Sequence, residues 1–115
     1  MDLALNAGAA LDTACSHAQQ AAERLLKGYL SAYDIDFPFT HNLARLLVLC
    51  QARDPAFSSL ATLAELLTPY AVDLRYDNRF WPSVEVAREA RDAALTIKDF
   101  VIQRLPPDFV AAGEG

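Results

Sequence analysis

Several residue types are scarce in this sequence, and each scarcity argues against a class of protein. Only 4 of the 115 residues are glycine, and β-branched residues are few, which favours helix over strand. No uninterrupted apolar run approaches the ~20 residues that a membrane-spanning helix needs. No lysine or arginine precedes Arg24, so the start lacks the basic region of a secretion signal. We therefore expect a soluble, cytoplasmic protein that does not associate with membranes.

The motifs of the common enzyme classes are also missing. The sequence contains no glycine-rich phosphate loop, no GxGxxG, no HExxH, no CxxC and no GxSxG. Its two cysteines, Cys15 and Cys50, fit free buried thiols best, although a disulfide, a redox pair or metal ligation is an alternative. Two histidines are too few for an ordinary zinc site. We expect no metal and no cofactor.

What is abundant is apolar. Apolar residues make up 53% of the chain and charged residues 22%, with a net charge of -5. This length suits one domain. The acidic balance opposes broad electrostatic binding to nucleic acid, although a local basic patch is compatible with it.

Apolar residues recur at helical spacing in successive segments, which predicts an all-α fold. We expect one domain over residues 1–115, an antiparallel up-and-down bundle of four to five helices whose first helix is short. That short piece covers Asp2 to Ala7 and breaks near Gly8. Residues 108–115 are expected to be a flexible tail.

The remaining helices follow from capping signals and proline positions. The first long helix runs from about Leu11 to Tyr33 and buries a stripe that includes Ala14 and Ala21. The next begins at His41 after a Thr40 cap and ends near Arg53. The third long helix is expected from Ala56 to Leu74, after an Asp54 cap and with Pro55 in its first turn; at Pro69 we expect a kink or a restart capped by Thr68. The last helix follows a Ser83 cap and runs to about Leu105.

Two groups of residues are candidates for binding. A polar stripe on the first long helix holds His17, Gln20, Arg24 and Lys27 at spacings of three and four; it suits a phosphate or simply faces water. The segment 70–81 holds Arg75, Tyr76 and Arg79 among aromatic residues. These side chains suit a stacked base and a phosphate, or they close the end of the bundle or form a protein interface.

His41 stands apart from both groups, before the second long helix. It suits hydrogen bonding to a ligand, or capping and loop packing.

Three segments in combination resemble the HEPN family, named for nucleotide binding in higher eukaryotes and prokaryotes. They are Ala14-Cys15-Ser16-His17-Ala18-Gln19-Gln20-Ala21-Ala22-Glu23-Arg24 with Lys27, then Phe39-Thr40-His41-Asn42-Leu43 with Leu46-Leu47, then Leu67-Thr68-Pro69-Tyr70-Ala71-Val72-Asp73-Leu74-Arg75-Tyr76. The closing helix, Ala87 to Val101, also fits. The resemblance covers nearly the whole chain and implies a helical bundle, often dimeric. Relatives usually carry a full helix before the Cys-Ser-His segment, so this beginning looks short.

The resemblance also implies a function. Many bacterial and archaeal relatives are paired with a minimal nucleotidyltransferase as toxin and antitoxin. Many are metal-independent ribonucleases that use an arginine followed by four to six residues and a histidine. No arginine in this chain precedes a histidine at that spacing, and cleavage needs such groups placed together.

The first hypothesis is therefore a non-catalytic module that dimerises, binds a nucleotide or RNA, and associates with a nucleotidyltransferase. Its candidate ligand-binding residues are His17, Gln20, Lys27, His41, Arg75, Tyr76 and Arg79. The alternative is a divergent ribonuclease toxin in which His17 or His41 works with Arg75. A third reading is a structural dimer module without a ligand.

Overall fold

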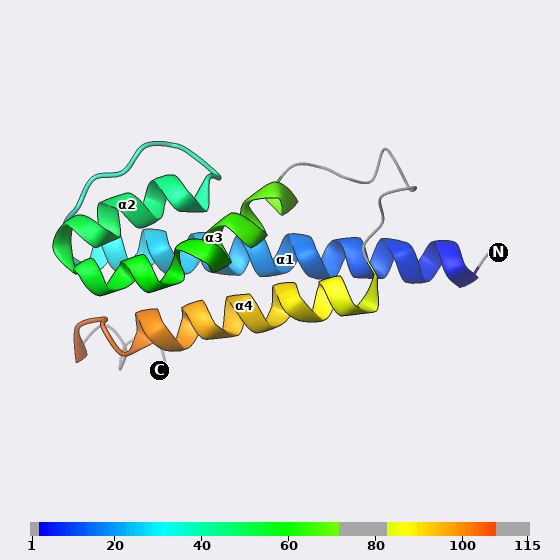
Figure 1. Cartoon of the computed structure of the whole chain (residues 1–115). Coiled ribbons are helices and arrows are strands. Elements are labelled where there is room, and N and C mark those ends of the chain that lie inside the picture. Colours follow the sequence, from blue (N-terminus) through cyan, green and yellow to red (C-terminus); the bar gives the residue numbers. More distant parts are fainter. Residues whose placement is uncertain (1–2, 72–82, 108–115) are drawn as a thin grey trace.

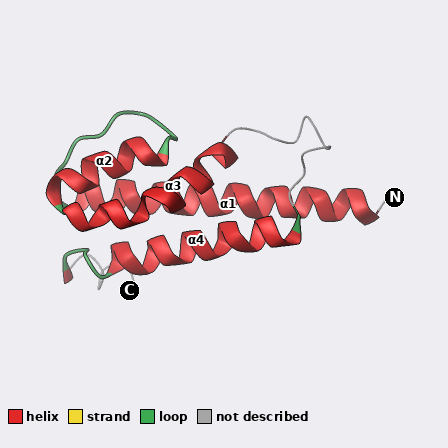
Figure 2. Ribbon diagram, in the orientation of Figure 1, coloured by secondary structure: helices red, strands yellow, loops and turns green. Residues whose placement is uncertain are grey.

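The computed structural model describes residues 3–71 and 83–107, and side chains from residue 10 onward in those ranges. All the regular structure in these ranges is helical (Figure 2). The elements are α1 (Leu3–Ala32), α2 (Leu43–Arg53), the 3-10 helix η1 (Pro55–Leu60), α3 (Ala61–Leu67), the 3-10 helix η2 (Thr68–Ala71) and α4 (Val84–Ile102). The all-α helical bundle is confirmed. None of the described helices is long and apolar enough to cross a membrane.

The helix directions differ from a simple up-and-down order. Contacts advance together along α1 and α2, since Gln19 bonds His41 and Arg53 bonds Tyr29, so these helices run the same way. Figure 1 shows α4 running with them and α3 running against them. The reason is the connection over 33–42. Ten extended residues reach about 33 Å, enough to return along the roughly 16 Å of α2.

The first helix is the longest rather than the shortest. α1 is continuous over 30 residues from Leu3, so the expected break near Gly8 is absent, and a full helix precedes the Cys-Ser-His segment. One glycine costs a helix only about 1 kcal/mol, and the alanines and leucines around it favour the helix.

α1 ends in a Schellman motif. The backbone amide of Ile35 donates to the Leu30 carbonyl at 2.8 Å, and that of Asp34 donates to the Ser31 carbonyl at 3.1 Å. Asp34 has a φ of 57°, the left-handed conformation that glycine adopts most easily. Ile35 then packs against the core.

Side chains begin the later helices. Asn42, and not Thr40, caps α2 by accepting from the Arg45 amide at 3.3 Å, while the Thr40 hydroxyl accepts from the Asn42 amide. The Asp54 and Ser83 caps are confirmed at η1 and α4. Short carboxylate, amide and hydroxyl side chains satisfy the free amides of a first turn.

The segment around the two inner prolines is divided more finely than expected. A 3-10 helix precedes α3, and a second 3-10 helix follows it at Thr68. Thr68 has helical backbone angles and does not cap a new helix. Its hydroxyl instead donates to the Ala64 carbonyl at 2.7 Å and accepts from the Leu43 amide at 3.2 Å, which ties η2 to the start of α2. Leu74 lies outside the described residues, and so does the tail over 108–115.

The core lies where all four helices meet. The apolar residues at helical spacing in α2 and α4 are buried, among them Leu43, Leu46, Ile97 and Val101, whereas Leu105 beyond the end of α4 is half-buried. Both cysteines are buried free thiols. Ala14 and Ala21, which we expected inside, are exposed. Ala14 and Ala21 instead line a concave surface between α1 and α4.

An arginine–tyrosine cluster (Tyr29, Tyr33, Arg53, Asp54 and Arg104) closes the end of the bundle where α1, α2 and α4 finish. The Arg53 guanidinium lies 3.4 Å from the Tyr33 ring centroid and donates to the Tyr29 hydroxyl at 3.1 Å. The Tyr33 hydroxyl donates to the Arg104 carbonyl at 2.6 Å, and the Arg104 side chain pairs with Asp54 at 3.2 Å. The cluster joins the three helix ends.

Candidate functional site

A polar cleft of about 390 Å³ lies beside the middle of α1. α1 provides one wall, the segment before α2 provides a second, and the end of η2 provides a third. The lining residues are Ser16, Gln19, Gln20, Glu23, Arg24, His41 and Ala71. Ala71 is the last described residue before the gap at 72–82.

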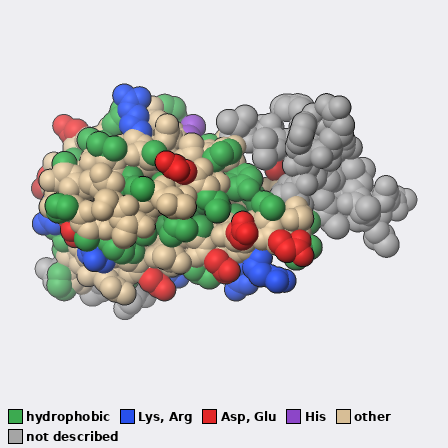
Figure 3. All heavy atoms as spheres, in the orientation of Figure 1, with side chains coloured by type: hydrophobic (Ala, Val, Ile, Leu, Met, Phe, Trp, Pro, Cys, Tyr) green, Lys and Arg blue, Asp and Glu red, His purple; other side chains and the backbone are tan. Residues whose placement is uncertain are grey.

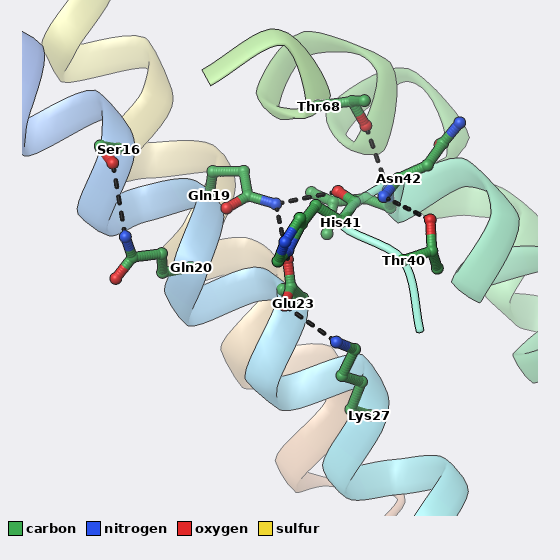
Figure 4. A network of polar contacts seen from close by, with 10 residues as sticks. Ser16, Gln19, Gln20, Glu23, Lys27, Thr40, His41, Asn42 and Thr68 are labelled. Atoms are coloured by element: carbon green, nitrogen blue, oxygen red, sulfur yellow. Dashed lines mark hydrogen bonds and ion pairs between the residues drawn. The ribbon is translucent and has the colours of Figure 1, made fainter. Parts of the chain in front are cut away.

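Glu23 is the centre of the cleft's polar network, and three side chains donate to its carboxylate (Figure 4). Gln19 donates from Nε2 at 3.0 Å, Lys27 from Nζ at 3.0 Å, and the Nδ1 of His41 lies 2.9 Å away. Burial raises the pKa of Glu23, but the hydrogen bonds from these partners and the Lys27 charge outweigh it, so the pKa is lowered. An ionised Glu23 holds the imidazole in one orientation.

Gln19 holds the Glu23–His41 pair from its buried side. Its side chain is 1% exposed, and its Nε2 group donates both to Glu23 and, at 3.0 Å, to the backbone carbonyl of His41. The loop carrying His41 is therefore tied to α1 through a buried amide. The Thr40 hydroxyl and the Thr68 hydroxyl secure the next turn of backbone (Figure 4).

Two exposed side chains accompany the cleft: Arg24, which lines it, and Phe39, which packs against its lining residue His41. Phe39 is 92% exposed, and its ring meets the His41 ring edge-on at 5.6 Å between centroids. The Lys27 ammonium lies 5.7 Å from the same Phe39 ring. Arg24 is exposed and makes no ion pair with another described residue. A ligand in the cleft therefore has an exposed guanidinium in its lining and an exposed aromatic ring beside His41.

The structure brings together only some of the residues expected to bind a ligand. Gln20 and His41 line the cleft, and Lys27 reaches it through Glu23. His17 instead lines a separate apolar groove between α1 and α4. The stripe predicted from helical spacing therefore divides between two surfaces.

The other three candidates, Arg75, Tyr76 and Arg79, lie outside the described residues. No group of three or more histidine, cysteine, aspartate or glutamate side chains in the described ranges is placed to hold a metal ion.

Sequence reasoning did not single out Gln19, Glu23 or Phe39. Glu23 gives no signal of its own, because pairing with a histidine eighteen residues away is invisible to helical spacing. Gln19 lies one position from Gln20, and the side of the helix on which each points decides which is buried. Phe39 carried one signal, an aromatic residue between Pro38 and Thr40 in a loop.

The fold and the cleft together define an all-helical domain with a polar, hydrogen-bonded cleft on its surface. The family model of the HEPN domain matches residues 2–105, so the chain belongs to the HEPN family. At the level of the family this is a nucleotide- or RNA-related module. No curated protein and no solved structure matches the chain.

Proposed function

We propose that this protein is a non-catalytic module that binds a nucleotide or an RNA end in the polar cleft. The observation that carries the proposal is that Arg24 and His41 line one cleft and that the Phe39 ring packs against His41, while Glu23 and Gln19 fix the imidazole. An aromatic face stacks on any base, and a guanidinium recognises phosphate.

Each cleft residue has a distinct expected role. Phe39 offers the stacking surface, and Arg24 offers charge-assisted hydrogen bonds to phosphate. His41 and Gln20 offer hydrogen bonds to the sugar or the base. The Glu23 carboxylate pairs with the Lys27 ammonium and accepts a hydrogen bond from His41, which limits its repulsion of an anion.

The test is binding of a fluorescent ATP analogue and of a short single-stranded RNA by the full chain. Loss of one charge-assisted hydrogen bond, about 1.5–3 kcal/mol, should make Arg24→Gln bind tenfold or more weakly. Phe39→Ala should also weaken binding without changing helicity. Arg88→Gln, an exposed arginine on α4, is the matched control. Equal affinities of Arg24→Gln and Arg88→Gln would remove the cleft assignment.

Arg75, Tyr76 and Arg79 remain part of the proposal, because the chain enters their segment from Ala71 at the edge of the cleft. Arg75→Ala should weaken ligand binding while leaving helicity intact. Unchanged binding in this variant would confine the site to α1 and the loop before α2.

Dimerisation and association with a minimal nucleotidyltransferase, as a toxin–antitoxin pair, belong to the same proposal and rest on family membership. Light scattering of the purified chain, alone and with ATP, tests the first. Co-purification with a nucleotidyltransferase encoded beside it tests the second. A monomer at all concentrations would contradict the dimer.

One observation favours the divergent ribonuclease as a second candidate. Arg24 and His41 line one cleft, and Glu23 orients the imidazole as a general base requires. RNA integrity read on the binding samples separates the two. Cleavage that persists in Arg88→Gln and disappears in His41→Ala would put the ribonuclease first; intact RNA supports the binding module.

A further inference from the structure

A second concave surface of about 290 Å³ lies between α1 and α4. Its lining is mostly apolar: Ala14, Ala18, Ala21, Leu25, Ala94 and Leu95. Leu95 is 44% exposed, and Val84 on the neighbouring part of α4 is 52% exposed. Two of the large exposed hydrophobic side chains of the described chain therefore lie along this side of α4.

The ionisable residues of this groove are all basic. They are His17 on one edge and Arg91 and Lys98 on the other. The chain as a whole is acidic, with 15 acidic residues against 10 lysines and arginines. Acidic and basic side chains are interspersed over the face in Figure 3, so a groove with basic edges alone is a local departure. Neither Arg91 nor Lys98 makes an ion pair with another described residue.

The spacing of the basic residues indicates the length of a matching partner. Arg91 and Lys98 are two turns apart, about 10 Å along α4, and they flank Leu95. On the α1 side, Ala14 to Leu25 spans about 16 Å. Small side chains on α1 let a third helix approach closely, as in ridge-and-groove packing. A helix of about three turns fills this length.

We propose that the α1–α4 groove docks an acidic amphipathic helix of a partner protein. Its apolar side packs against Leu25 and Leu95, and carboxylates seven residues apart pair with Arg91 and Lys98. A second copy docked by the same face about a two-fold axis places these cations against one another, which opposes self-association there. The proposal is independent of ligand binding, because the groove shares no lining residue with the polar cleft.

The probe is a synthetic helical peptide with leucine and alanine on one side and glutamates at seven-residue spacing beside them. Its affinity for the full chain is measured by fluorescence anisotropy, alongside a peptide with lysine in place of each glutamate. We expect saturable binding of the acidic peptide only, weakened more than tenfold by Leu95→Glu and about three- to tenfold by Arg91→Glu. Arg45→Glu, an exposed arginine on α2, should have no effect, and circular dichroism should show that all variants keep their helicity.

Several results would overturn this assignment. They are equal binding of the two peptides, no saturation up to millimolar peptide, or an acidic-peptide affinity that Leu95→Glu leaves unchanged. A dimer that Leu95→Glu converts to a monomer would show that a second copy of the chain occupies the groove. Binding to anionic vesicles that is lost in Arg91→Glu would show that the groove meets an anionic membrane. Nucleotide affinity measured on Leu95→Glu should equal that of the wild type, so failure of the groove and failure of the cleft are distinguishable.

Discussion

Replacing Gln19 by methionine tests whether the buried amide builds the cleft. Methionine matches glutamine in length and in helix propensity, so the change removes hydrogen bonds and little else. One of these bonds goes to an ionised carboxylate, worth about 1.5–3 kcal/mol, and the other to a carbonyl, worth about 1 kcal/mol. We expect the free energy of unfolding to fall by about 2.5–4 kcal/mol, a large part of the stability of such a domain.

Gln20→Met is the matched control, because the neighbouring side chain is exposed and only approaches Ser16 at 3.5 Å. Its effect should stay within about 0.5 kcal/mol. Urea unfolding followed by circular dichroism measures both variants, with equal slopes against denaturant required for the comparison. Equal losses in the two variants would refute the role assigned to Gln19.

Four further predictions rest on other parts of the molecule. The partners of Glu23 lower its pKa, so its ionised form stabilises the fold above the ordinary glutamate range, and this stabilisation is lost as pH falls. Between about pH 5 and pH 3, the free energy of unfolding measured in urea should therefore fall less in Glu23→Gln than in the wild type. Asp34→Gly should raise the free energy of unfolding by about 1 kcal/mol in thermal or urea melts, since glycine relieves the left-handed backbone; a decrease would contradict the strain. Phe57→Ala should lower it by about 3–5 kcal/mol, because the fully buried ring contacts other aromatic rings. Burial raises the pKa of Cys50 to about 12, and burial with a nearby carboxylate raises that of Cys15, so both thiols should resist alkylation at pH 8 in the native state and react on unfolding, as mass spectrometry would show.

The fold class and most helix boundaries could be predicted because apolar residues repeat at helical spacing. In α2 they are leucines, and in α4 alanines share the spacing with Ile97 and Val101. Ala14 and Ala21 could not be placed, because alanine is helical anywhere and carries little burial preference of its own. The helix directions were also beyond reach. They depend on whether the connection over 33–42 is extended enough to return along α2, and its sequence gives no sign of that.

The candidate site could likewise be predicted only in part. His41 and Gln20 stand out as residue types that bind ligands, and both line the cleft. The pairing of His41 with Glu23, and the burial of Gln19 between them, depend on two helices lying parallel. Local periodicity carries no information about such contacts.

The arginine–tyrosine cluster has a consequence for how the domain opens. It ties the last turns of α1, α2 and α4 together, whereas the first turns of α1 extend past the other described helices (Figure 1). Amide protons near Tyr29 and Tyr33 should therefore exchange with deuterium only through global unfolding, while protection should fall along α1 towards Leu3. The cleft lies between these extremes, on the part of α1 where a bound ligand has room to slow the exchange of the amides around it.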